Sequence, residues 1–166
     1  MRPHSSPSPA MVALTMSTFM VIASFMVVVS LSQPAHSLTV QQHVKQTRVV
    51  VATLHGKNVV PGPGDPNGKG HAVIALRSAK GEVCGLKLAW QGLGKVTGAN
   101  IRGAASGESG DIVVDLTRWV TQGSRCVEAR SGLIQRMANH PWRYYVSMDT
   151  KAFPAGAIRG QQHHQS

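Results

Sequence analysis

Apolar and polar side chains alternate along residues 144–149, close to the C-terminus of the chain. Tyr144, Val146 and Met148 fall on one side of this run, which is the two-residue period of a β-strand. Pro154 and Gly156 interrupt the pattern, and residues 157–159 resume it. The alternation therefore predicts two strands joined by a Pro/Gly corner, a feature that restricts the chain to folds with paired strands.

The rest of the chain has the same character. Short β-branched or alternating runs are separated by Gly, Pro and Asn-rich turns. We predict strands at residues 47–54, 71–77, 82–91, 96–102 and 112–117. In the 82–91 strand, Cys84 shares a face with Leu86, Leu88 and Trp90, and this face is expected to point into the core.

Only one segment is expected to be helical. Ser131 is a suitable N-cap, Leu133, Ile134 and Met137 recur at helical spacing, and 139–141 ends the helix. Six or seven short strands with one short helix predict an all-β fold, specifically an antiparallel Greek-key β-sandwich or barrel.

The first 37 residues resemble an export signal. Residues 10–31 are uncharged and largely apolar, and small residues precede a cleavage site expected after Ser37. We therefore predict a signal peptide at 1–37, a linker at 38–46, one domain at 47–161 and a disordered tail at 162–166. The alternative is that residues 10–31 are retained as an N-terminal membrane anchor, because the run is long enough to span a bilayer. The predicted location is secreted, periplasmic or at the cell envelope, with membrane contact only through an uncleaved N-terminal segment.

The chain is strongly basic, with 17 Lys and Arg against 7 Asp and Glu and a net charge of +10. Such a surplus favours anionic partners, and the candidates are polysaccharide, a lipid headgroup or an acidic protein. Export argues against a specific nucleic-acid partner, so none is expected.

The two cysteines, Cys84 and Cys126, are expected to form a disulfide in an oxidising compartment. Two alternatives remain open from the sequence. The residues could be buried thiols in a reducing compartment, or a metal-binding pair. The second would need further ligands, which no CxxC or HxxxH spacing supplies.

The order of several motifs resembles that of the chordin-type (CHRD) domain, as found in exported bacterial proteins with one such domain. The similar segments are 52–61 (ATLHGKNVVP), 81–84 (GEVC), 101–105 (IRGAA), 112–116 (IVVDL) and the closing 144–161, which ends in FPAGAIRGQ. The resemblance implies an immunoglobulin-like or superoxide-dismutase-like β-sandwich. It implies no catalytic activity, because none is settled for the family.

The chain departs from the family pattern at two places. Family members often have His-Ile-His where this chain has Asn100, Ile101 and Arg102, and a histidine where it has Asp149. We expect Asn100 and Asp149 to approach one another, with Arg102 beside them repelling a cation. No metal and no cofactor are therefore predicted, and a degenerate superoxide-dismutase-like metalloprotein is kept as the alternative function.

One basic segment is a candidate binding site. Five arginines lie within one short stretch that also contains Trp119 and Trp142, with Glu128 as the only acid: Arg118, Arg125, Arg130, Arg136 and Arg143. Guanidinium groups fit sulfate, phosphate and carboxylate, and indole rings stack on sugars. The alternative is that these arginines only solvate the helix while the tryptophans pack inside.

No catalytic signature accompanies this segment. The sequence has no phosphate-binding loop, no dinucleotide fingerprint and no Gly-x-Ser-x-Gly elbow. We therefore expect a non-enzymatic extracytoplasmic module that acts in interaction or structure and binds anionic glycan or envelope components.

Overall fold

The computed structural model describes residues 47–166. The predicted signal peptide or anchor and the 38–46 linker lie outside these residues, so both remain predictions. Among the described residues, no helix is both long and apolar enough to cross a membrane.

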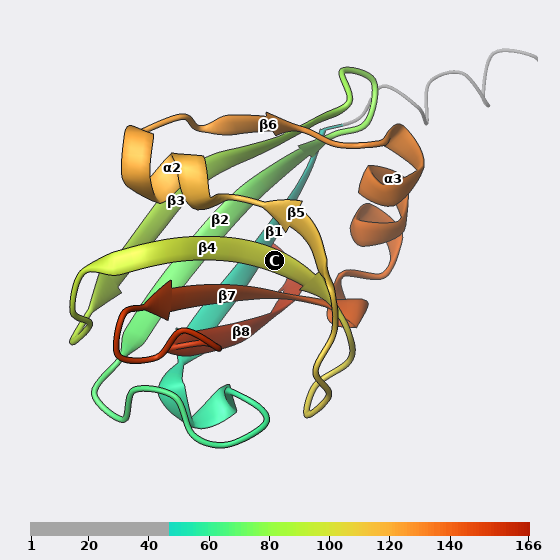
Figure 1. Cartoon of the computed structure of the whole chain (residues 1–166). Helices are drawn as coiled ribbons and strands as arrows, with labels where there is room; N and C mark the ends of the chain where they lie inside the picture. Colours follow the sequence, from blue (N-terminus) through green and yellow to red (C-terminus); the bar gives the residue numbers. More distant parts are fainter. Residues whose placement is uncertain (1–46) are drawn as a thin grey trace, which may run out of the picture. The chain divides into compact units, whose positions relative to one another are not determined.

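The described residues form eight antiparallel strands with little helix, in a sheet that curls into a nearly barrel-like shape (Figure 1). The strands are β1 (Thr47–His55), β2 (Lys69–Arg77), β3 (Glu82–Gln91), β4 (Val96–Gly103), β5 (Ile112–Asp115), β6 (Cys126–Glu128), β7 (Tyr144–Thr150) and β8 (Ile158–His164). The helices are α2 (Thr117–Gln122) and α3 (Ser131–Asn139), with short 3-10 turns η1 (Gly56–Asn58) and η2 (Pro141–Arg143). The predicted bounds of β1–β5, β7 and α3 are thus confirmed to within about two residues, as is usual for element ends. The closing strand β8 extends to His164, beyond the predicted 157–159, and β6 was not predicted.

The predicted division into two sheets is not confirmed, because one continuous sheet has the order β5-β4-β7-β8-β1-β2-β3-β6. The sheet is continuous because β8 pairs with β7 on one side and with β1 on the other. The β1 ladder reaches His163 and His164. The prediction of a disordered tail beginning at 162 was therefore wrong for residues 162–164, which complete the strand.

The inner face of the curled sheet contains the hydrophobic core. Alternate residues of β1, β2 and β7 point inward, including Leu54, Ile74 and Met148. The apolar side of α3 adds Ile134 and Met137, as the helical spacing predicted. Burial of each such side chain contributes roughly 1.5–3 kcal/mol, so this inward face is the main stabilising element.

The prediction of a single helix was wrong, because α2 also forms; with six residues and no apolar period it has no helical signal in the sequence. Its first turn is fixed by the Asp115 carboxylate, which accepts a hydrogen bond from the Thr117 N–H at 2.7 Å. The helix ends at Gly123, whose φ of 72° is the left-handed conformation typical of glycine after a helix. α2 contacts β4, and its Trp119 packs against Gly85 of β3, where an added Cβ would overlap the indole. The helix thereby fills the gap between β3 and β4, which are consecutive but not paired.

A β-bulge in β3 overturns one prediction. Val73 pairs with Lys87 and Ile74 with Gly85, so Leu86 is the extra residue and the alternation changes sides there. Val83 lies in the core before the bulge and Leu88 packs against the core after it, while Leu86 is 48% exposed. Cys84 is buried but belongs to the opposite, outer face, so the expectation that it points into the core was wrong.

Ser131 does not cap α3 as predicted. Arg130 occupies the N-cap position without a side-chain cap, and the Ser131 hydroxyl instead donates to the Ser78 carbonyl at 2.9 Å. This bond connects the start of α3 to the turn between β2 and β3.

The Gln162 side chain provides a test of the packing. This residue is 1% exposed, and neither its amide nitrogen nor its amide oxygen has a hydrogen-bond partner among the described residues. We expect Gln162→Met, which conserves volume and removes the buried polar atoms, to raise the free energy of unfolding by about 1–2 kcal/mol in denaturant titrations.

The adjacent Gln161→Met variant is the matched control, and its free energy of unfolding should fall instead of rise. The Gln161 amide nitrogen donates to the carbonyls of Ala104, Trp142 and Tyr144 at 2.7–2.9 Å, so its removal should be destabilising. Destabilisation by Gln162→Met as well would show that the buried amide is hydrogen-bonded in solution.

Candidate functional site

The outer face of β4, β7 and β8 presents a patch of polar side chains. Since neighbouring residues of a strand point to opposite sides, the inward packing of Ile101, Val146 and Met148 turns their neighbours outward. The register then places Asn100 opposite Ser147, and Ser147 opposite Arg159. These polar residues are buried although they lie on the outer side of the sheet.

Asp149 is the acceptor at the centre of this patch. Its Oδ2 accepts a hydrogen bond from the Asn100 amide at 3.1 Å, and its Oδ1 accepts one from the Ser147 hydroxyl at 3.2 Å. The expected approach of Asn100 and Asp149 is therefore confirmed. One carboxylate, one amide and one hydroxyl next to the Arg102 charge are a poor donor set for a zinc-class or copper ion, which favours several nitrogen or sulfur ligands.

Burial raises the pKa of Asp149 above its ordinary value, while the bonds from Ser147 and Asn100 and the charge of Arg102 partly oppose the shift. A raised pKa in the folded state means that the fold binds the proton more tightly than the unfolded chain does. The contribution of Asp149 to stability is therefore largest below the ordinary carboxyl pKa and is lost as the pH rises through the folded-state value.

We expect Asp149→Asn to remove this loss of stability at rising pH. The amide resembles the protonated acid and retains acceptor and donor atoms for Asn100 and Ser147. The variant should match the parent below the ordinary carboxyl pKa of about 3.9 and be the more stable protein at neutral pH. Denaturant titrations across this pH range measure the difference, and a variant that is less stable than the parent at neutral pH would contradict the burial argument.

Arg159 fixes the glycine-rich loop between β4 and β5 onto this face. Arg159 is 4% exposed, and its guanidinium donates to the carbonyls of Glu108 and Ala105 at 2.6 and 2.9 Å. It also lies over the Tyr145 ring, 3.6 Å from the centroid. Burial lowers the pKa of Arg159, but an arginine retains its proton at physiological pH.

Two further contacts fix the far end of the same loop. Arg102 donates to the Gly110 carbonyl at 3.2 Å, and the Gly110 N–H donates to the Tyr145 hydroxyl at 3.3 Å. No role was predicted for Arg159 or Gln161, although both belong to the closing GAIRGQ motif. The motif itself was the available signal, and its polar residues hold the loop at residues 104–110.

The fixed loop forms one wall of an open groove of about 540 Å³, which α3 and the start of β7 complete. Arg136 of α3 and Arg143 of η2 line it, together with Glu108. The lining also includes Val113, Leu133 and the mostly buried Tyr144. Of the five arginines singled out in the sequence, the structure therefore brings two together in one concave site.

The other three arginines do not line this groove. Arg118 lies on α2 and donates to Gln122 at 3.3 Å, Arg125 precedes β6, and Arg130 precedes α3. The two tryptophans also differ. Trp119 packs against the core, whereas Trp142 is 54% exposed and meets the His140 ring edge-on.

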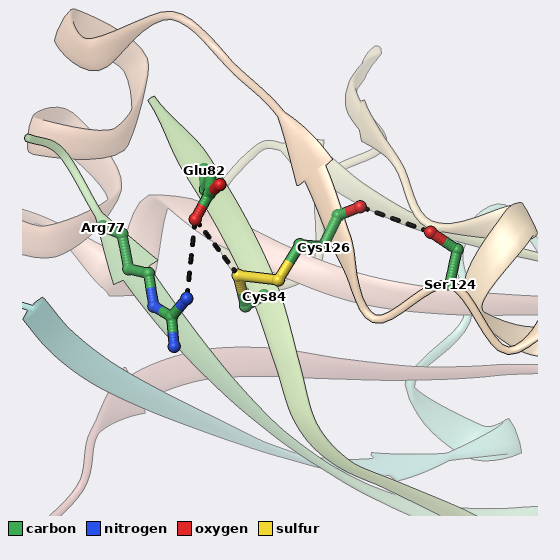
Figure 2. Close-up of a disulfide and its surroundings, with 5 residues drawn as sticks. All are labelled: Arg77, Glu82, Cys84, Ser124 and Cys126. Atoms are coloured by element: carbon green, nitrogen blue, oxygen red, sulfur yellow. Dashed lines mark hydrogen bonds and ion pairs between the residues drawn. A yellow bond between two sulfur atoms is a disulfide. The ribbon is translucent and has the colours of Figure 1, made fainter. Parts of the chain in front are cut away.

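The predicted disulfide is confirmed. Cys84 of β3 and Cys126 of β6 are directly opposite each other in the ladder, with their Cα atoms 4.0 Å apart (Figure 2). Arg77 forms an ion pair with Glu82 beside the bridge at 3.5 Å. The bond attaches the short edge strand β6, and with it the connection between α2 and α3, to the sheet.

Comparisons with known proteins agree with the motif reading. A model of the CHRD domain family matches residues 50–162, which is most of the described chain. Neither the curated proteins nor the solved structures contain a significant match.

Proposed function

Because this chain belongs to the CHRD domain family, we propose that it is a non-enzymatic interaction module that acts outside the cytoplasm and binds anionic polysaccharide. The observation that carries the proposal is the groove containing Arg136 and Arg143. Both arginines are exposed, and within residues 47–166 neither forms an ion pair. Their guanidinium groups are therefore available to a ligand.

The composition of the groove supports a sugar acid or sulfated sugar. Two guanidinium groups outweigh the single Glu108 carboxylate, so the groove has a positive balance, and each guanidinium can bind a carboxylate or sulfate through two hydrogen bonds. The partly buried side chains of Leu133 and Val113 supply apolar surface. Apolar surface bordered by a few polar groups is typical of small-molecule sites, and it suits the apolar face of a sugar ring.

The test compares two double variants with the same change of charge. We expect Arg136→Ser/Arg143→Ser to weaken binding to a soluble sulfated polysaccharide at least tenfold, since each charge-assisted hydrogen bond contributes about 1.5–3 kcal/mol. Arg118→Ser/Arg125→Ser, outside the groove, should weaken binding only through general electrostatics. Titration calorimetry at fixed ionic strength measures both, and equal losses in the two variants would refute the groove as the site.

Action outside the cytoplasm is the second part of the proposal. It is supported by the leader-like residues 1–37 and by the disulfide, because such bonds persist in oxidising compartments. The intact mass of the protein recovered from its host distinguishes a chain cleaved after Ser37 from one anchored through residues 10–31. Recovery of the full-length chain from a soluble reducing compartment would refute export.

A further inference from the structure

The sequences around the two cysteines are mirror images of each other. Residues 82–84 read Glu-Val-Cys and residues 126–128 read Cys-Val-Glu. The two strands are antiparallel, so Cys84 lies opposite Cys126 and Glu82 lies opposite Glu128. Residues two apart on a strand share a face, and the four polar side chains therefore form a block of two thiol and two carboxylate positions on the outer face.

The ligand atoms of this block are already close. The Glu82 carboxylate, the Cys84 sulfur and the Cys126 sulfur all lie within 4.8 Å of one another. Oε2 of Glu82 is 3.9 Å from Sγ of Cys84. Figure 2 shows the Glu82 carboxylate directed toward the bridge. Glu128 occupies the fourth corner and is exposed, so its carboxylate is free to turn toward the other three.

The charge of the block also favours a cation. The chain has only seven acidic residues, yet two of them are directly opposite each other, where like charges are destabilising. Arg77 compensates Glu82 at 3.5 Å. No ion pair to Glu128 occurs in the part of the chain that the structure describes.

We propose that reduction of the disulfide converts this block into a binding site for a zinc-class divalent ion, with Cys84, Cys126, Glu82 and Glu128 as ligands. A dithiol is oxidised to its cyclic disulfide, or a phosphine and water to the phosphine oxide, which supplies two electrons and two protons. The S–S bond breaks and two thiols form. The metal ion then displaces two protons as both sulfurs bind as thiolates. In the oxidised chain the sulfurs are bonded to each other, so disulfide formation and metal binding exclude one another.

The fold keeps the ligands in place without the sulfur bridge. On one side of the block the Ala129 N–H donates to the Gly81 carbonyl at 2.8 Å, and on the other the Gly85 N–H donates to the Arg125 carbonyl at 2.6 Å. Two thiolates on a tetrahedral zinc ion, at about 2.3 Å each, are separated by about 3.8 Å. Cysteines directly opposite each other in an antiparallel ladder can adopt that separation without rearrangement of the strands.

This arrangement supplies the ligands that the sequence spacing lacked. No CxxC or HxxxH pattern is present, and the set is completed instead by pairing strands that are 42 residues apart in sequence. The site is independent of the arginine groove, which involves none of the four residues.

Cobalt(II) is the probe, because thiolate coordination gives it a charge-transfer absorption that nitrogen or oxygen ligands do not give. The full chain is used with His163→Ala and His164→Ala in every sample, so that the terminal imidazoles do not bind the probe. We expect one equivalent of cobalt to produce the thiolate band after reduction with a phosphine, zinc to displace it, and the oxidised chain to produce no band. A reduced chain without the thiolate band would overturn the proposal.

Glu128→Gln tests the carboxylate while leaving the cysteines and the Arg77–Glu82 pair intact. Competition with a chromophoric chelator should show zinc affinity lowered about tenfold or more, in the range typical for altered metal sites. Glu108→Gln, an exposed acid outside the block, is the matched control and should bind as the parent does. Equal affinities in the two variants would refute the four-ligand site.

Thermal unfolding gives a readout that does not require the cysteine variants to be stable. Zinc should raise the Tm of the reduced chain and leave that of the oxidised chain unchanged, because a ligand stabilises only the state that binds it. An equal shift in both redox states would overturn the proposal.

Discussion

Reduction of the Cys84–Cys126 disulfide should lower the free energy of unfolding by about 4 kcal/mol. The bond closes a loop with a sequence separation of 42 residues, and the chain-entropy model assigns that amount to the freedom the unfolded chain regains. The loop contains most of β3 together with β4, β5, α2 and their connections, so the constraint acts on about a third of the described residues. Denaturant titrations of the oxidised and reduced chain, with a chelator present to remove metal, measure the difference.

Cys84→Ala/Cys126→Ala is the control for this experiment. The reductant should not change the stability of this variant, and the variant should unfold close to the midpoint of the reduced parent. A loss below about 1 kcal/mol on reduction would contradict the chain-entropy argument, because the reduced unfolded chain would then be nearly as restricted as the oxidised one.

Arg159→Met should lower the free energy of unfolding by about 2–4 kcal/mol. The substitution keeps much of the aliphatic volume but removes both hydrogen bonds to the Glu108 and Ala105 carbonyls and the contact with the Tyr145 ring. Hydrogen bonds from charged donors contribute about 1.5–3 kcal/mol each, partly offset here by the cost of burying the guanidinium.

Local effects distinguish this role from general destabilisation. In Arg159→Met, amide hydrogen exchange should accelerate first in residues 104–110, the loop that Arg159 holds. Arg159→Lys should recover only part of the lost free energy of unfolding, because one ammonium cannot reproduce the planar guanidinium. Arg118→Met, on the exposed surface of α2, should change stability by less than about 0.5 kcal/mol. Uniform acceleration of exchange across the sheet, with no preference for the loop, would contradict the assignment.

Local patterns were sufficient for much of the fold. The alternation in residues 144–149 predicted β7, and the spacing of Leu133, Ile134 and Met137 predicted α3, because both signals arise within one element. The disulfide was also predictable, since two cysteines leave one intramolecular pairing. Likewise, the departure from the histidine pattern at Asn100 and Asp149 was visible in the sequence, and the structure added only their distance.

Long-range pairing decided the rest. The bulge at Leu86 depends on the register between β2 and β3, and it moves Cys84 to the outer face, which no pattern within β3 reveals. The five arginines are close in sequence, yet only Arg136 and Arg143 share the groove, because the position of the 104–110 loop depends on Arg159 from a distant strand.

The sequence by itself determined the strands other than β6, the position of α3 and the pairing of the cysteines, because these follow from side-chain periods and counts along the chain. Tertiary structure alone decided that β8 joins all the strands into one sheet and that Glu82 and Glu128 flank the disulfide on one face. Both outcomes are set by registers between strands far apart in sequence, and a shift of one residue in a register would turn every side chain of a strand to the other face.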